Sequence, residues 1–263
     1  VRDRAALANI LADYDVEAVY HLASLLSATG EQHPDRTWDV NMSGLKNILD
    51  LARTHTLRVF WPSSIAVFGP STPKADAPQN TVLDPATMYG VTKRSGELLC
   101  QYYHRRYGLD VRSLRYPGLV SYKTAPGGGT TDYAVDMYAR AADGQNYTCF
   151  LEPDARLPMM YMPDAIQATL DLMDADADAL SVRDSYNIAA FSFSPRDLVS
   201  AIQRRRSDFE CTYDPDARQR IADAWPASVD DTAARTDWNW APTYDLDAMT
   251  EDMLDHLREG ERM

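Results

Sequence analysis

Cysteine and long apolar runs are scarce in this sequence. The three cysteines, Cys100, Cys149 and Cys211, are odd in number and widely spaced, so neither a disulfide framework nor a cysteine-based zinc site is indicated. The five histidines are equally scattered, and we predict no metal. No apolar run approaches the ~20 residues of a membrane helix, and the first residues do not lead into the apolar core of a signal peptide. We therefore expect a cytoplasmic protein with no membrane partner.

Positive charge is also in short supply. Lysine and arginine number 26 against 39 aspartate and glutamate residues, a net charge of −13. Such a surface repels phosphate backbones, so we expect no nucleic-acid partner. Lysine occurs at four positions alone, which makes Lys93 stand out in the pattern discussed below.

A glycine-rich phosphate-binding turn is missing as well. The chain opens on helical spacing from Arg4 to Tyr14 and a short apolar strand from Val16 to Ala23, and G-x-x-G-x-x-G occurs nowhere. A nucleotide-binding sheet ordinarily begins with a strand and that turn. We expect the sequence to lack roughly 50 to 60 residues, the usual span of a β-α-β start and the next helix. The alternative is a molecule that has lost its pyrophosphate cradle.

The elements that are present alternate between strand and helix. Apolar strands at Leu57–Pro62 and Asp110–Tyr116 are separated by helical patterns at Pro34–Thr54 and from Tyr89 onward. This rhythm predicts α/β class, a Rossmann-like doubly wound parallel sheet whose first strands are absent, with a smaller C-terminal α/β substrate lobe. We assign residues 1–120 and part of 132–190 to the dinucleotide-binding domain, and 121–131 with about 150–263 to the intertwined lobe.

One constellation indicates catalysis. A strand delivers Ser64, and a helix then delivers Tyr89 and Lys93, four residues apart and therefore on one helical face. A nearby ammonium favours the phenolate, so Lys93 is expected to lower the pKa of Tyr89 and make it a proton acceptor for an alcohol that Ser64 orients. A tyrosine and a lysine one turn apart are usually only core and solvated face. The preceding strand and Ser63–Ser64 favour the catalytic interpretation.

These residues belong to a longer series of motifs. The following segments look like the successive motifs of extended short-chain dehydrogenases/reductases, the group that contains UDP-galactose 4-epimerase: Tyr20–Ser24, Asn41–Gly44, Ser63–Gly69 and Tyr89–Lys93. A narrower set resembles the epimerase-like L-threonine 3-dehydrogenases: Leu25–Ala28, Trp61–Pro70, Arg115–Leu119, Pro126–Tyr133, Pro158–Met162 and Ile221–Ser228.

The resemblance implies oxidation of L-threonine at its 3-hydroxyl to 2-amino-3-oxobutyrate, with hydride transfer to NAD+. It makes Tyr89, Lys93 and Ser64 the catalytic set. The implied substrate-binding residues are Ser27, Ser64, Tyr89, Thr130 and Thr131, and the implied cofactor-binding residues are Leu22, Ala23, Asn41, Tyr89, Lys93, Tyr116, Pro117 and Leu119. NAD rather than NADP rests on the resemblance alone. It also implies a homodimer, paired through the Pro34–Thr54 and Tyr89–Arg106 helices.

Other interpretations stay open. A nucleotide-sugar epimerase or dehydratase shares the fold and the catalytic set, but such enzymes generally carry Phe-Asn where this chain has Pro117-Gly118. A catalytically silent NAD(P)-sensing protein could use the same fold. Glycine runs such as Gly127–Gly129 are often only flexible loops, and the threonines after it could cap the next helix. Trp225 and Trp238 are expected to pack the smaller lobe.

Overall fold

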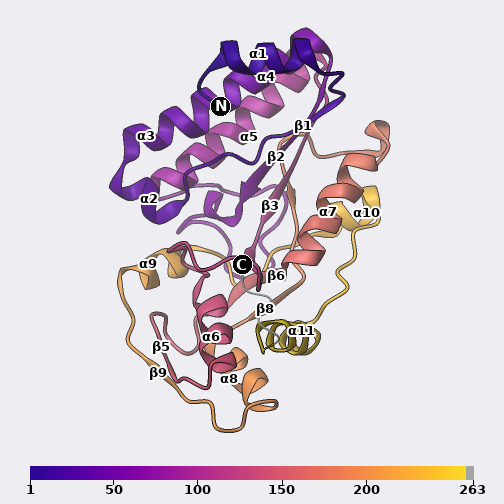
Figure 1. Cartoon of the computed structure of the whole chain (residues 1–263). Coiled ribbons are helices and arrows are strands. Elements are labelled where there is room, and N and C mark those ends of the chain that lie inside the picture. Colours follow the sequence, from indigo (N-terminus) through magenta and orange to yellow (C-terminus); the bar gives the residue numbers. More distant parts are fainter. Residues whose placement is uncertain (259–263) are drawn as a thin grey trace.

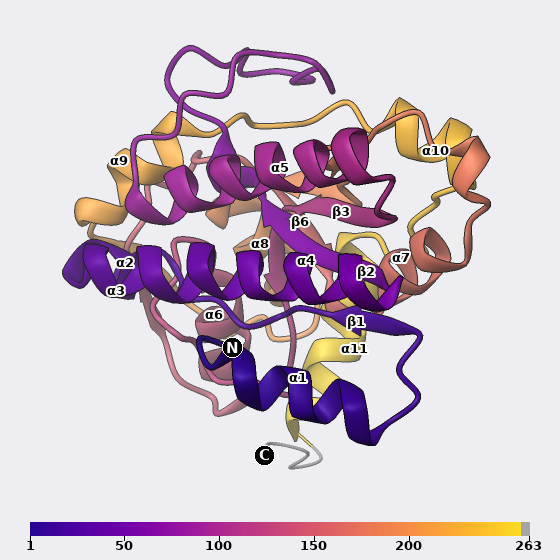
Figure 2. The same cartoon turned by 90° about the horizontal axis from the view of Figure 1, so that it is seen from above.

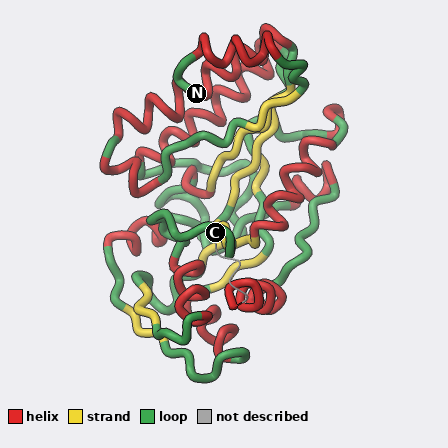
Figure 3. The backbone as a smooth tube through the Cα atoms, in the orientation of Figure 1, coloured by secondary structure: helices red, strands yellow, loops and turns green. Residues whose placement is uncertain are grey.

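A four-stranded parallel sheet organises the larger layer of the computed structural model, which describes residues 1–258 (Figures 1 and 3). Its strands lie in the order β1 (Ala18–Tyr20), β2 (Arg58–Ser64), β3 (Val111–Tyr116) and β7 (Tyr186–Asn187). The register of β2 on β3 places Ser64 beside Tyr116 at the carboxyl end of the sheet. The predicted α/β class with a parallel sheet is confirmed.

Helices α1 (Arg4–Asp13), α3 (Pro34–Trp38), α4 (Gly44–His55) and α5 (Met88–Tyr107) cover one face of this sheet (Figure 2). A short helix α2 (Ser27–Gln32) precedes α3, and a π-helical turn, Asp39–Ser43, joins α3 to α4. The predicted helix at Pro34–Thr54 is therefore continuous, with one widened turn. Apolar side chains of α4, α5 and the sheet pack into one buried core, which holds this layer together. Its members include Leu45, Leu49, Ala52, Val59, Trp61 and Cys100.

The opposite face carries α7 (Met162–Asp174) and α10 (Thr232–Trp238) (Figure 1). Buried Arg112 of β3 holds the end of α7 by donating from Nη1 to the carbonyl oxygens of Leu172, Met173 and Ala175 at 2.6, 3.1 and 2.7 Å. Trp238 packs edge-on against Tyr186 of β7, with ring centroids 6.0 Å apart. The expectation that Trp238 packs the smaller lobe is wrong, because the chain returns to the main sheet after residue 231.

The second layer lies at the carboxyl end of the main sheet. It holds a mixed sheet of β4 (Gly118–Val120), β6 (Leu157–Tyr161) and β8 (Phe191–Phe193), and a parallel pair of β5 (Tyr147–Cys149) and β9 (Cys211–Tyr213). Its helices are α6 (Tyr133–Ala142), α8 (Pro195–Gln203), α9 (Ala217–Ala224) and α11 (Leu246–Arg258). Only Pro117 separates β3 from β4, so the chain passes between the layers at that residue.

The chain crosses between the two layers several times. For that reason the predicted division at residues 120, 131 and 150 stays a prediction. No helix within residues 1–258 combines the length and the apolar character needed to cross a membrane.

Candidate active site

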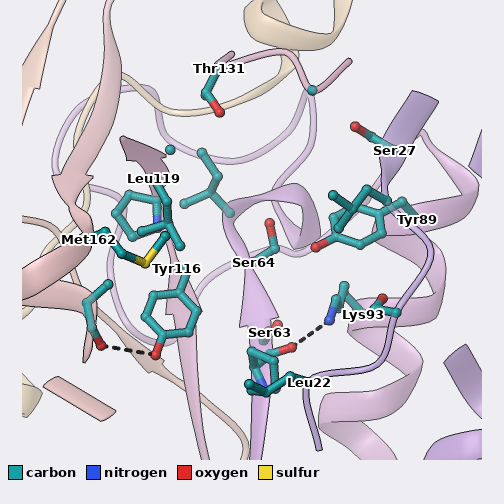
Figure 4. Close-up of a pocket in the computed structure, with 18 of the residues that line it drawn as sticks. Leu22, Ser27, Ser63, Ser64, Tyr89, Lys93, Tyr116, Leu119, Thr131 and Met162 are labelled. Atoms are coloured by element: carbon teal, nitrogen blue, oxygen red, sulfur yellow. Dashed lines mark hydrogen bonds between the residues drawn. The ribbon is translucent and has the colours of Figure 1, made fainter. Parts of the chain in front are cut away.

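A cavity of about 560 Å³ lies at the carboxyl ends of β1, β2 and β3, the edge at which open α/β sheets bind ligands (Figure 4). Ten of the residues predicted from sequence line it together: Leu22, Ser27, Ser64, Tyr89, Lys93, Tyr116, Pro117, Leu119, Thr130 and Thr131. Ala23 and Asn41 are outside this lining. Residues from five separate stretches of sequence thus converge on one space.

Ser64 ends β2 in extended conformation and lies between Tyr89 and the Tyr116–Leu119 segment in Figure 4. Its Oγ accepts a hydrogen bond from the backbone N–H of Ala66 at 3.2 Å, which caps a short 3-10 turn, Ile65–Val67. That bond uses an acceptor position, so the single hydroxyl hydrogen can be donated either to the Tyr89 oxygen or to a ligand. Ser64 can therefore donate to an oxygen in the cavity.

Tyr89 is placed by the start of α5. The N-cap Thr87 accepts from the Gly90 N–H at 3.1 Å, and Glu31 of α2 accepts from the Met88 N–H at 2.6 Å. Gly90 is required here, because a Cβ at that position would lie 2.2 Å from the carbonyl oxygen of Ala66. This close approach of the helix to the turn after β2 brings Tyr89 to Ser64.

Burial dominates the electrostatics of Tyr89. It raises the pKa of Tyr89 to about 12, and a hydrogen bond with Ser64 acts in the opposite direction. Lys93 does not lower this pKa in the structure, contrary to the expectation from sequence. Its ammonium lies 5.4 Å from the centroid of the Tyr89 ring and donates instead to the carbonyl oxygen of Pro62 at 2.6 Å.

The pKa of Lys93 is also strongly shifted by its surroundings. Its side chain is 3% exposed and its Nζ lies 4.8 Å from the centroid of the Trp61 ring. Desolvation lowers the pKa of Lys93 to about 7. An ammonium has three donors, so the bond to Pro62 leaves donors for a ligand in the cavity.

Asn41 supports the cavity from behind. Its amide accepts from the Leu25 N–H at 2.8 Å and donates to the Leu25 carbonyl at 3.1 Å and the Thr92 hydroxyl at 3.0 Å. It thereby ties the segment between β1 and α2, which carries Leu22, to α5. The predicted contact of Asn41 with a cofactor stays a prediction.

The glycine loop before α6 forms the roof of the cavity. One carboxylate oxygen of Asp132, Oδ2, accepts from the N–H groups of Gly127 and Gly129, both at 2.7 Å, so the loop is tied down by hydrogen bonds. Thr130 is 3% exposed, and its hydroxyl has no hydrogen-bond partner among the described residues. A buried hydroxyl without a partner is costly, and a ligand in the cavity could satisfy it.

Sequence reasoning missed one wall. Five residues of α7 line the cavity, namely Met162, Ala165, Ile166, Thr169 and Leu170. Tyr116 is held against this helix by its hydroxyl, which donates to the Ala165 carbonyl at 3.3 Å and shares a hydrogen bond with the Thr169 hydroxyl. The four-residue spacing of Met162, Ile166 and Leu170 is the sequence pattern that could have indicated an apolar helix face at the cavity. Trp225 also lines the cavity, so the expectation that it only packs the smaller lobe is incomplete.

Metal ligation has no support in the described part of the chain. Across residues 1–258 no group of three or more His, Cys, Asp or Glu side chains is arranged to hold a metal ion.

Comparison with known proteins places this site in a family. Residues 1–189 match the NAD dependent epimerase/dehydratase family. An uncharacterized epimerase/dehydratase of Staphylococcus haemolyticus is 48% identical over 263 residues, covering 100% of this chain and 83% of its own.

Two solved structures are similar over nearly the whole chain. An L-threonine dehydrogenase from Cupriavidus necator is 54% identical with a TM-score of 0.96, covering 97% of this chain and 83% of its own. A monomeric L-threonine 3-dehydrogenase from a metagenome is 50% identical with a TM-score of 0.96, covering 99% and 84%. The likeness to epimerase-like dehydrogenases expected from sequence is confirmed. The chain belongs to the NAD-dependent epimerase/dehydratase family.

Proposed function

We propose that this protein oxidises L-threonine at its 3-hydroxyl to 2-amino-3-oxobutyrate, with hydride transfer to NAD+. The observation that carries the proposal is the convergence of Ser64, Tyr89 and Lys93 with Ser27, Thr130 and Thr131 on one cavity. The first three form an alcohol-oxidising set. The second three supply hydroxyls suited to the amino and carboxylate groups of a small zwitterion.

The cavity suits the nicotinamide end of NAD. Lys93 has donors left for ribose hydroxyls, and Tyr116, Pro117 and Leu119 form an apolar wall against which a planar ring can pack. Bound NAD+ would supply the hydride acceptor and a positive charge. Every other part of the chemistry falls to side chains of this chain.

Proton transfer is assigned to Tyr89. With its pKa at about 12, roughly one molecule in 100,000 carries the phenolate at neutral pH. Positive charge near the phenol must lower that pKa before Tyr89 can accept the proton of the substrate hydroxyl. The positive charge of bound NAD+ would serve this purpose, and Ser64 donates to the substrate oxygen to hold it beside Tyr89.

Substrate selection is assigned to the loop and to α2. The unpartnered Thr130 hydroxyl, with Thr131 and Ser27, would bind the charged groups of threonine, which leaves its hydroxyl-bearing carbon toward Tyr89 and Ser64. A hydroxyl that is already desolvated gains a bond without a further desolvation cost. This favours a small polar substrate over an apolar alcohol.

A sugar nucleotide fits the site less well. Sugar-nucleotide enzymes of this group generally carry Phe-Asn where this chain has Pro117-Gly118. A Cβ at position 118 would lie 2.4 Å from Sδ of Met159 and 2.8 Å from Cβ of Thr131. A side chain at position 118 would therefore require Met159 and Thr131 to move, which counts against an asparagine that helps to hold a sugar nucleotide there.

Reduced-cofactor absorbance tests the proposal. We expect L-threonine with NAD+ to give turnover, while UDP or dTDP sugars give no product and Tyr89→Phe gives no turnover with threonine. The same gene extended upstream should be assayed in parallel. Folded proteins of both lengths that bind NAD and leave threonine unchanged would contradict the proposal, and product from a sugar nucleotide would favour the epimerase alternative.

We also propose a homodimer that pairs through the α3–α4 and α5 helices. Large apolar side chains are exposed along this face: Trp38, Val91, Leu98, Tyr102 and Tyr107. Val91, Leu98 and Tyr102 follow one another at intervals of seven and four on α5, which forms a stripe suited to a helix of a second copy. Light scattering should give twice the chain mass, and Leu98→Glu should give the monomer. A monomeric wild-type protein would contradict this.

A further inference from the structure

A buried carboxylate lies directly behind the catalytic residues. Glu97 of α5 is 0% exposed, and its two oxygens accept four hydrogen bonds. The donors are Ser63 Oγ at 2.7 Å, Arg115 Nε at 2.8 Å, Arg115 Nη2 at 3.0 Å and Arg94 Nη1 at 3.0 Å. A buried charge is tolerated when it is paired and fully hydrogen-bonded, which describes Glu97.

The spacing along α5 connects Glu97 to the site. Tyr89, Lys93 and Glu97 follow at intervals of four and share one helical face. Lys93 donates to the carbonyl oxygen of Pro62, and Glu97 accepts from the hydroxyl of Ser63. Two consecutive turns of the helix are thus bound to two consecutive residues of β2, and the next residue of that strand is Ser64.

The third partner is β3. Arg115 pairs with Ser63 in the sheet register, and the next pair along is Ser64 with Tyr116. Arg115 reaches Glu97 through a two-pronged ion pair, the geometry in which guanidinium and carboxylate hold each other most firmly. Glu97 therefore joins α5, β2 and β3 next to the residues of these elements that line the cavity.

Charges around Lys93 give Glu97 a second role. The groups that act on the ammonium are His21 after β1, and Glu97 and Cys100 on its own helix. Burial raises the pKa of Cys100, so its thiol stays protonated, and burial with the nearby Lys93 lowers the pKa of His21 to about 4, so its ring stays neutral. Arg94, Arg115 and Asp184 complete the network on the far side of Glu97. Among these groups, Glu97 is the anion that favours a protonated Lys93.

We propose that Glu97 is a positioning residue for the oxidation. Its carboxylate clamps α5 to β2 and β3, which sets the approach of Tyr89 to Ser64, and its charge favours the protonated form of Lys93. The inference deepens the proposed function and rests on it for the turnover measurements alone.

Glu97→Gln tests both roles, and Asp184→Asn is the matched control. Asp184 is also a carboxylate paired with Arg94 and Arg115, but it is partly exposed and makes no bond to Ser63. Lysine labelled with ¹³C at Cε gives few signals, because lysine occurs at four positions. The signal lost in Lys93→Met belongs to Lys93, and its pH titration reports the Lys93 pKa without substrate or cofactor.

In Glu97→Gln we expect the Lys93 titration to move down by about one pH unit, since a unit charge one helical turn away is removed. We expect turnover with threonine to fall on the order of tenfold to hundredfold through kcat, with the alkaline limb of the pH profile moved in the same direction. Asp184→Asn should leave both readouts at wild-type values. A folded Glu97→Gln protein with the wild-type Lys93 titration, or with wild-type kcat, would overturn the inference.

If Glu97→Gln does not fold, Ser63→Ala still tests whether the contact of α5 with β2 through Glu97 matters for turnover. It removes the bond between β2 and Glu97 and leaves every charge in place. We expect reduced kcat with an unchanged Lys93 titration, and unchanged kcat would overturn the inference. Wild-type protein that does not oxidise threonine would contradict the proposed function instead, and the Lys93 titration would then decide this inference by itself.

Discussion

Replacing Lys93 with methionine should stabilise the fold while it abolishes turnover. Burial lowers the pKa of Lys93 from 10.5 to about 7, so holding its ammonium in the folded protein costs about 4 kcal/mol at neutral pH. Methionine has similar length and no charge. It leaves the Pro62 carbonyl without its donor, which costs about 1–3 kcal/mol, so a net gain of about 1–3 kcal/mol remains.

The sign of the pH dependence follows from proton binding. Between the folded pKa near 7 and the unfolded pKa near 10.5, the unfolded chain binds more protons, so stability rises with pH and is lost as pH falls. Lys93 should contribute a rise of about 1.5 kcal/mol in the free energy of unfolding between about pH 7 and about pH 8.5. Above that window the buried Cys100, whose pKa is raised, acts in the opposite direction.

Urea unfolding followed by circular dichroism measures this difference. Wild-type protein should gain stability across the window, while Lys93→Met should lack that rise and be more stable at neutral pH. Lys46→Met, which removes an exposed lysine, should keep the wild-type slope. Parallel pH dependence in wild type and Lys93→Met, or a net loss of stability in Lys93→Met, would refute the reasoning that burial controls this lysine.

Three further changes test the site and its support. Tyr89→Phe removes the proposed proton acceptor and should lower kcat by ~100- to 10,000-fold with NAD binding retained in calorimetry; near-normal turnover would rule out the proposed role. Thr130→Val should raise the KM for threonine by roughly tenfold and leave that for NAD+ unchanged, because it removes the unpartnered hydroxyl alone. Gly96→Ala should destabilise the protein by about 1–3 kcal/mol in denaturant titration, since its Cβ would lie 2.4 Å from the Trp61 ring, while Gly127→Ala, with open space around it, should not.

Local pattern was enough to predict the elements that carry the catalytic set. The apolar run before Ser63 and Ser64 indicated β2, and the spacing of Tyr89 and Lys93 indicated one face of α5, because both depend on neighbours in sequence. The ordered motifs indicated the family, and ten of the twelve predicted site residues share the cavity.

Tertiary structure decided the properties that depend on burial and on contacts between distant segments. The pKa of Tyr89 is raised instead of lowered because burial outweighs its hydrogen bond with Ser64, while the Lys93 ammonium donates to the Pro62 carbonyl. Arg115 reaches Glu97 across 18 positions of sequence, and Trp225 reaches the cavity from another layer, and no local periodicity encodes either contact. Sequence by itself determined which chemical groups are available, and only the fold decided which of them are dry, paired or facing the cavity, because these depend on packing between segments that are far apart in the chain.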